Sequence, residues 1–271
     1  MAYTNNTIEA QSKAKICSGL KLLTPSNPKT IKGEKKGYVT FILHLAPARL
    51  SGYQVCPMAT KGCTAACLNT AGRSGLAKGE GRLTVSDIES GKRTNVIQNA
   101  RIRKTRLFFE HRNVFILRLI KDIMRAIRWT KSHGLTPVFR LNGTSDIRWE
   151  TVRIGDKTVF ELFPDIQFYD YTKIANRKNL PDNYHLTFSL ADGNDEQAEQ
   201  ALRNGMNVAA VFRNKAIIER YKDIGFVLNG LVTPVVDGDD TDLRFLDQRG
   251  AIVALYAKGN AKNDRSGFVR D

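Results

Sequence analysis

The feature that most constrains the fold is a repeated alternation of short apolar runs, each ending in polar residues, with helix-like segments. An early apolar run is YVTFILHLAP, and six later ones are TPVFRLNGTSD, IQFYDYTK, YHLTFSLADGND, MNVAAVFRN, GLVTPVVDGDD and AIVALYAKGNAK. Strands that alternate with helices favour βα units and parallel pairing. The pattern therefore predicts an α/β fold, a complete or partial (β/α) barrel, with a doubly wound open sheet as the alternative.

Segments with helix signals lie between the later runs, and a longer one lies upstream, between the first run and the second. EQAEQALRNG has an acidic start and a glycine stop, and KAIIERYKDIG follows the next strand. Further upstream, Ile116, Ile120, Ile123 and Ile127 recur at the spacing of one helical face. We expect a long helical region there, with basic side chains on its other face.

The chain contains no repeat and no low-complexity linker. Its first 35 residues are polar and rich in lysine. We expect residues 1–35 to form a polar N-terminal extension and residues 36–271 to form a single barrel-like domain.

The chain is strongly basic, with a formal net charge of +15. Such a charge attracts polyanions, nucleic acid above all, although it also serves solubility. We predict a nucleic-acid or nucleotide partner. The candidate contacts lie in the basic helical region: Arg101, Arg103, Lys104, Arg106, Arg118 and Arg125.

No apolar stretch approaches the ~20 residues needed to span a bilayer, and the N-terminus lacks the pattern of a signal peptide. We expect a soluble protein without a membrane partner, located in the cytoplasm. In a reducing compartment, clustered cysteines more often bind metal or do redox chemistry than form disulfides.

Three of the four cysteines lie within one short segment, at Cys56, Cys63 and Cys67, separated by six and then three residues. Thiolates are soft ligands that suit iron–sulfur clusters or zinc. Pro57 and Gly62 would help the segment to turn. The alternative is three unrelated buried cysteines, since free cysteine is often buried. We interpret the three cysteines as metal ligands.

The number of cysteines bears on the metal. A structural zinc normally has four ligands, and Cys17 or His44 would have to supply the fourth. Three cysteines alone match a [4Fe–4S] cluster with one open iron, the arrangement that binds S-adenosylmethionine. We expect the cluster with S-adenosylmethionine, and zinc is the alternative.

Polar side chains follow the predicted strands. In a barrel the active site lies at the carboxyl ends of the strands, although polar residues also begin helices and form turns. We predict a catalytic set and a cofactor-binding set. The catalytic candidates are Asp146, Asp170, Lys173 and Asp237, and the cofactor-binding candidates are Asn142, Ser145 and Ser189.

The position of the cysteines, directly after the first predicted strand, resembles that of the cluster loop in the radical S-adenosylmethionine superfamily. The usual spacing there is three residues and then two, whereas this chain has six and then three. At a finer level the chain resembles an uncharacterised phage protein family related to the phage gene product 88 proteins. This resemblance runs from about residue 25 to the C-terminus, over LAPARLSGYQVCPMATKGCTAACLNTAGR, RLNGTSDIRWE, FYDYTK and DGDDTDLRFLD. It implies a phage or prophage origin, with the host cytoplasm as the location, and a common fold. It supplies no reaction.

Three functional hypotheses remain open. The first is a phage-type metalloenzyme with a three-cysteine iron–sulfur site that modifies a nucleotide or a nucleic-acid base. The second is base exchange like that of deazaguanine transglycosylases, with a structural zinc and with Asp146 and Asp170 as nucleophile and base. The third is a zinc-stabilised nucleic-acid-binding protein without catalysis.

Overall fold

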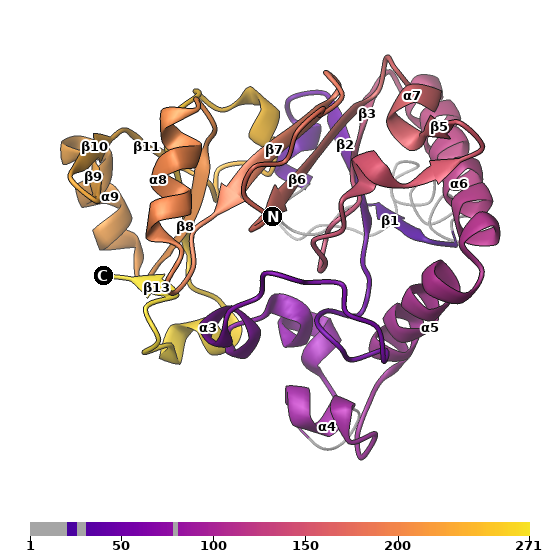
Figure 1. Cartoon of the computed structure of the whole chain (residues 1–271), viewed down its shortest axis with the longest axis horizontal. Coiled ribbons are helices and arrows are strands. Elements are labelled where there is room, and N and C mark those ends of the chain that lie inside the picture. Colours follow the sequence, from indigo (N-terminus) through magenta and orange to yellow (C-terminus); the bar gives the residue numbers. More distant parts are fainter. Residues whose placement is uncertain (1–20, 26–30, 78–80) are drawn as a thin grey trace, which may run out of the picture.

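The centre of the molecule is a nine-stranded sheet in which β1 alone runs antiparallel to its neighbour (Figure 1). The computed structural model describes residues 21–25, 31–77 and 81–271. The strand order is β1-β2-β3-β6-β7-β8-β12-β11, and β13 also pairs with β8. The strands are β1 Leu23–Pro25, β2 Tyr38–Leu43, β3 Thr136–Arg140, β6 Gln167–Thr172, β7 Tyr184–Ser189, β8 Val208–Phe212, β11 Val235–Asp237, β12 Ile252–Tyr256 and β13 Val269–Arg270.

The predicted mixed α/β fold with largely parallel pairing is confirmed. A complete barrel is not confirmed, because the strand order starts at β1 and ends at β11 without a pairing, among the described residues, that closes it. Each predicted apolar run contains a strand. The run GLVTPVVDGDD is divided at Pro234, which has no N–H to donate to a ladder. Its first half, β10 Leu231–Thr233, pairs with β9 Phe226–Leu228, and its second half is β11.

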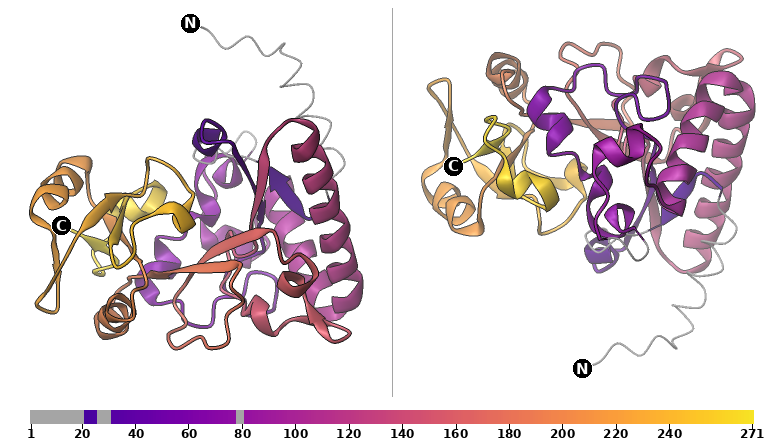
Figure 2. Two further views of the ribbon diagram at one scale, coloured as in Figure 1. Left: turned by 90° about the horizontal axis from the view of Figure 1, so that it is seen from above. Right: turned by 90° about the horizontal axis from the view of Figure 1, so that it is seen from below.

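The helices pack on one face of the sheet, in two groups (Figures 1 and 2). The first group comprises α5 Val96–Glu110 and α6 Arg112–Ser132, which pack beside β2 and β3, and the second comprises α8 Asp195–Arg203 and α9 Lys215–Ile224, which pack beside β8 and β12. The sequence predicts one long basic helical region, and the structure has two helices that meet at His111. The predicted apolar face of α6 is confirmed, since Ile116 and Ile123 are buried against the sheet.

Strand register explains the core beneath the helices. Phe41, Phe139 and Phe168 are successive partners across β2, β3 and β6, and all three are fully buried. Burial of each such ring stabilises the fold by roughly 2–3 kcal/mol. We call the opposite side of the sheet the inner face. It carries Tyr169 and Val138, and Leu243 of the segment 241–247 packs on them.

The remaining elements are short. They are α2 Ile31–Glu34, α3 Lys61–Ala65, α4 Val85–Glu89, α7 Val159–Leu162, β4 Arg153–Ile154, β5 Lys157–Thr158 and five 3-10 turns, η1 Leu68–Thr70, η2 Gly72–Gly75, η3 Trp149–Thr151, η4 Arg244–Leu246 and η5 Gly259–Asn263. In Figure 1, α3 and α4 lie below the sheet, at the end towards which β6 and β7 point.

Part of the predicted N-terminal extension joins the sheet. Leu22 and Leu23 are buried, and the Asp122 carboxylate on α6 accepts hydrogen bonds from their backbone N–H groups at 2.7 and 3.1 Å. Residues 1–20 and 26–30 of the extension lie outside the described residues, and the boundary at residue 35 stays a prediction. Among the described helices, none combines the length and the apolar character needed to cross a membrane.

Candidate functional site

The three clustered cysteines lie close enough for their charges to interact. Cys56 lies in the loop after β2, Cys63 in α3, and Cys67 directly after α3. Burial, with a smaller contribution from negative charge on Cys67 and Cys63, raises the pKa of Cys56 to about 12. Burial also raises the pKa of Cys67, again with a contribution from Cys63. All three are free thiols.

The arrangement of these thiols is not that of ligands around one ion. In residues 21–25, 31–77 and 81–271, no group of three or more His, Cys, Asp or Glu side chains is placed to hold a metal ion. Cys17 lies outside the described residues. The thiols thus form a loose cluster, and their predicted role as ligands stays a prediction.

The helix that carries Cys63 is fixed to the end of β7. Thr60 caps α3 by accepting a hydrogen bond from the Cys63 N–H at 3.1 Å. The Asp192 carboxylate, just after β7, accepts hydrogen bonds from the Thr60 hydroxyl and from the Gly62 N–H. A Cβ atom at Gly62 would lie 2.0 Å from the Ser266 hydroxyl and 2.6 Å from Asp192. Only glycine therefore allows this close approach.

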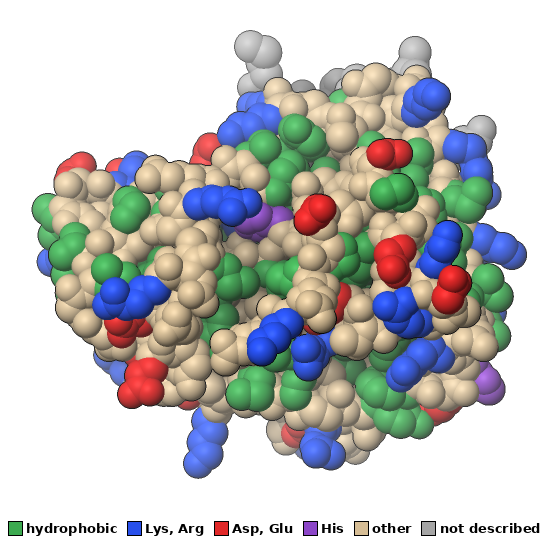
Figure 3. Space-filling view, turned by 45° about the horizontal axis from the view of Figure 1, so that its top comes forward, with side chains coloured by type: hydrophobic (Ala, Val, Ile, Leu, Met, Phe, Trp, Pro, Cys, Tyr) green, Lys and Arg blue, Asp and Glu red, His purple; other side chains and the backbone are tan. Residues whose placement is uncertain are grey.

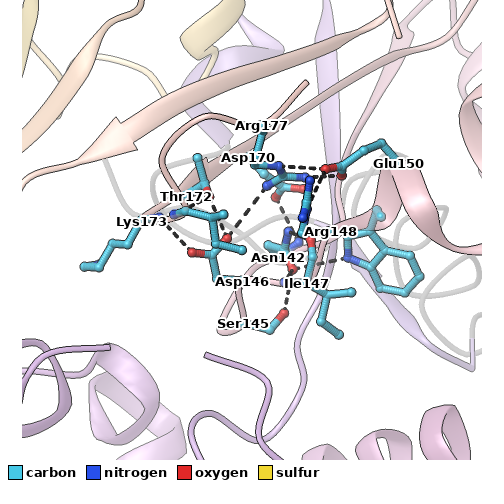
Figure 4. Close-up of polar contacts among 12 residues, drawn as sticks. Asn142, Ser145, Asp146, Ile147, Arg148, Glu150, Asp170, Thr172, Lys173 and Arg177 are labelled. Atoms are coloured by element: carbon cyan, nitrogen blue, oxygen red, sulfur yellow. Dashed lines mark hydrogen bonds and ion pairs between the residues drawn. The ribbon is translucent and has the colours of Figure 1, made fainter. Parts of the chain in front are cut away.

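Asp146 joins the cysteine loop to the ends of two strands. Its carboxylate accepts hydrogen bonds from the Thr172 hydroxyl at 2.8 Å and from the Lys173 N–H at 2.7 Å (Figure 4). Its own N–H donates to the Val55 carbonyl, next to Cys56, at 2.7 Å. Burial raises the pKa of the Asp146 carboxyl. The predicted catalytic candidates Asp146 and Lys173 are thus brought together beside Cys56.

Two cations act on Cys67. The charges of Lys173 and Arg101 both lower its pKa, against the larger effect of burial. Figure 4 shows the Lys173 side chain extending away from the other labelled residues. Arg101 is held by the carbonyl and side-chain oxygens of Asn69, at 2.9 and 2.5 Å. Positive charge therefore adjoins the cysteine cluster.

A buried ion pair behind Asp146 was missed by sequence reasoning. Arg177 pairs with Glu150, and both side chains are almost fully buried. Arg177 also lies 3.7 Å from the Asp146 carboxylate. Glu150 ends the motif RLNGTSDIRWE and so could have been noticed, whereas no pattern marks Arg177.

Two of the predicted cofactor-binding residues are engaged inside their own loop. Asn142 Oδ1 accepts hydrogen bonds from the Ser145 hydroxyl, the Ile147 N–H and the Trp149 ring N–H, at 2.9, 2.9 and 3.2 Å. Figure 4 shows these contacts around Asn142. Asn142 and Ser145 therefore shape the loop that carries Asp146.

Asp170 is fully buried between β3 and β6. Its carboxylate accepts hydrogen bonds from the backbone N–H groups of Leu141 and Asn142, at 3.1 and 2.9 Å, and from the Tyr184 hydroxyl at 3.0 Å. Burial raises its pKa to about 7. Just after the end of β3, the Asp170 carboxylate thus accepts the backbone hydrogen bonds that a neighbouring strand would otherwise accept.

The other predicted residues lie apart from this group. Ser189 is partly buried at the end of β7. Asp237 is exposed on β11, and β7, β8 and β12 lie between that strand and β6. Its carboxylate accepts a hydrogen bond from the Asp239 N–H at 2.8 Å.

Of the basic residues predicted to contact nucleic acid, two have side chains directed into the protein and four have exposed side chains. Arg101 is buried, and Lys104 donates a hydrogen bond to the Leu22 carbonyl at 2.6 Å. The exposed ones are Arg103, Arg106, Arg118 and Arg125, of which Arg106 donates to the Ser51 carbonyl at 3.1 Å. On the face in Figure 3, Lys and Arg side chains are spread among Asp and Glu rather than gathered in one patch.

A surface pocket of about 500 Å³ borders the cysteine helix. Its lining contains two exposed basic side chains, Lys61 and Arg265. The other lining residues are Gly62, Ala65, Ala66, Asn260, Asn263, Asp264 and Ser266. Its size falls in the range of small-molecule sites.

Fold and site together define a mixed α/β protein with three free thiols at the carboxyl end of a largely parallel sheet. A family model described as gene product 88 matches residues 20–271, so the chain belongs to the gene product 88 family. The predicted relationship to the phage gene product 88 proteins is confirmed. No curated protein and no solved structure matches the chain. The comparisons give no support to the resemblance to the radical S-adenosylmethionine superfamily.

Proposed function

We propose that this chain is a phage-type metalloenzyme that holds an iron–sulfur cluster on Cys56, Cys63 and Cys67 and modifies a nucleotide or a nucleic-acid base. The observation that carries the proposal is the mutual charge interaction of these three thiols beside the strand ends. Parallel α/β sheets place their active sites at this edge.

The electrostatics of the three thiols suit a bound metal cluster. Without a cation, burial and the charge of neighbouring thiolates raise the pKa values of Cys56 and Cys67 and keep these two thiols protonated, and metal binding would release their protons. Lys173 and Arg101 would offset the negative charge of a thiolate-ligated cluster, which is costly to bury alone. A bound [4Fe–4S] cluster with one open iron would supply electrons for the reductive cleavage of S-adenosylmethionine.

The chain's own polar groups would then bind and orient the substrate. Asp146 and Lys173 are the best-placed polar pair, because they lie next to Cys56 and Cys67. Lys61 and Arg265 in the adjoining pocket would bind the phosphate of a nucleotide. The contacts of Asn142, Ser145 and Asp170 favour a positioning role for these three residues.

The two other hypotheses have weaker support. Base exchange needs a nucleophile and a base, but Asp170 already accepts three hydrogen bonds. Nucleic-acid binding without catalysis would rely on the basic helices, where Arg101 and Lys104 point inward. We therefore rank both below the metalloenzyme.

The test is a cleavage assay under anaerobic conditions. Reconstituted protein, a strong one-electron reductant and S-adenosylmethionine should yield 5′-deoxyadenosine and methionine. Cys63→Ser should abolish this yield while the circular dichroism spectrum is retained, and full activity of that variant would exclude the proposal. Exchange of a labelled guanine analogue into DNA would instead support the transglycosylase hypothesis. DNA affinity that falls steeply with salt, without cleavage or exchange, would support the binding protein.

A further inference from the structure

The inner face of the sheet carries a group of buried polar atoms that lack partners. The group consists of five atoms: Tyr171 Oη, Thr187 Oγ1, His185 Nε2, Arg140 Nε and Arg244 Nε. Within the described part of the chain, none of these atoms has a hydrogen-bond partner. We call these five residues the inner-face donor cluster. An unsatisfied buried polar group costs about 1–3 kcal/mol, so five at one place require an explanation.

The register places these residues side by side. Tyr171 on β6 and Thr187 on β7 are direct partners, and His185 lies two positions before Thr187, on the same face. The Arg140 guanidinium carbon lies 4.9 Å from the centre of the Tyr171 ring. The Arg244 charge acts on both Tyr171 and His185.

Hydrogen-bond donors dominate this cluster. Burial raises the pKa of Tyr171 to about 12, so its hydroxyl stays protonated. The two arginine Nε–H groups can only donate, and the threonine hydroxyl can donate as well. Burial lowers the pKa of His185 to about 4, which keeps its ring neutral. None of the five groups carries a negative charge, so the cluster offers no anionic acceptor of its own.

The nearby carboxylates are already engaged. Arg140 Nη1 lies 2.7 Å from the Asp242 carboxylate, and Arg244 Nη1 lies 3.0 Å from that of Asp247. Thr187 and Arg244 are fully buried, whereas Tyr171 and His185 as whole residues are partly buried, with their Oη and Nε2 atoms covered. A small ligand with several acceptor oxygens would accept hydrogen bonds from the cluster donors that Asp242 and Asp247 do not bind.

We infer that the inner-face donor cluster binds the oxyanion of a small molecule, a phosphate or a carboxylate. The inference does not rest on the cysteine cluster or on the proposed function. Tyr171 precedes Lys173 by two positions at the carboxyl end of β6. A ligand held by its oxyanion at this cluster would therefore extend towards the cysteine loop.

The test measures the thermal unfolding midpoint of the full chain in chloride, inorganic phosphate and acetate at equal ionic strength. At least one oxyanion should raise the midpoint saturably. Thr187→Val and Tyr171→Phe should each weaken the apparent affinity about tenfold or more. Neither variant should lower the midpoint in chloride, because each removes an unpartnered hydroxyl. Thr130→Val is the matched control, since the buried Thr130 hydroxyl is bonded within α6.

The outcomes separate the sources of the oxyanion. A response to phosphate alone assigns a phosphate ligand, and a response to acetate alone assigns a carboxylate; a response to both supports the shared chemistry. The inference is overturned if neither anion shifts the wild-type midpoint. It is also overturned if both variants respond as the wild type does, which is the behaviour of nonspecific binding to a basic protein. Thr130→Val should keep the wild-type response.

Discussion

The Asp192 carboxylate accepts a hydrogen bond from the Gly62 backbone N–H at 3.1 Å, across 130 positions of the chain. It also accepts a hydrogen bond from the hydroxyl of Thr60, the residue that caps α3. A short helix has little stability of its own. The contact with the end of β7 therefore sets where α3 and its cysteine lie.

Asp192→Asn should lower the free energy of unfolding by about 1–3 kcal/mol, since the amide cannot accept both hydrogen bonds on two oxygens. Urea unfolding measures the change. Asp165→Asn is the control, because Asp165 is exposed, and its effect should stay within about 0.5 kcal/mol. Equal effects of the two variants would show that Asp192 does not anchor the helix.

Gly143→Ala should destabilise the loop that carries Asp146. A Cβ atom at residue 143 would lie 2.5 Å from the Ile42 side chain and 2.8 Å from the Leu43 carbonyl oxygen, which is backbone and cannot rotate away. We expect a loss of about 1–3 kcal/mol in urea unfolding. At Gly33 the same atom would meet Leu243 at an ordinary 3.5 Å, so Gly33→Ala should be nearly neutral. A neutral Gly143→Ala would contradict the described close approach.

Two arginines of α5 should behave oppositely. Arg101→Met removes a buried guanidinium and leaves the side-chain oxygen of Asn69 without its donor, while the Asn69 carbonyl keeps its hydrogen bond from Gln98, so stability should fall by about 2 kcal/mol. Arg103→Met, on the exposed side, should change stability by less than about 0.5 kcal/mol. Chemical denaturation of both variants checks this. If the Arg101→Met protein were as stable as the wild type and bound DNA more weakly, Arg101 would be a nucleic-acid contact, as predicted from the sequence, and not a structural residue.

The pH dependence of stability should report on His44. Burial lowers its pKa to about 3, helped by the charges of Arg101, Arg140 and Lys104. In the unfolded chain, histidine takes up a proton near pH 6.5. The unfolded state therefore binds more protons between about pH 6.5 and 3, and His44 makes stability fall as the pH falls through that window.

Replacement of His44 by Gln should make this slope shallower by about 1 kcal/mol per pH unit between pH 6 and 5. Denaturant unfolding at several pH values gives the slopes of wild type and variant. Comparison of the two cancels the other titrating groups, such as Asp170 and His185. His111→Gln, at an exposed position, should retain the wild-type slope. An unchanged slope in the His44 variant would contradict the buried neutral ring.

The sequence predicted most of the sheet because each parallel strand is a short apolar run with turn residues after it. The strand around Leu23 was missed, since it is three residues long within a polar segment. The hairpin of β9 and β10 was missed because Pro234 divides a run that otherwise looks like one strand. Closure of a barrel depends on whether the first and last strands of the sheet pair with each other. A local sequence pattern carries no information on this long-range pairing.

The site was predicted in part. The clustered cysteines, Asp146 and Lys173 were picked out because they follow strands directly, and the structure places them together. Asp170 looked catalytic on the same ground, yet its carboxylate accepts hydrogen bonds from the backbone N–H groups of Leu141 and Asn142, just after the end of β3. Arg101 looked like a surface cation because its partner, Asn69, is 32 positions away. Such long-range partners cannot be read from spacing.

The most direct test of the central claim is the content of iron, acid-labile sulfide and zinc in protein purified anaerobically, with its visible absorption spectrum. We predict a brown protein with about four irons per chain, the count of a [4Fe–4S] cluster. The metal should be lost in Cys56→Ser, Cys63→Ser and Cys67→Ser, and kept in Cys17→Ser. A colourless protein that holds one zinc, or no metal, would contradict the account.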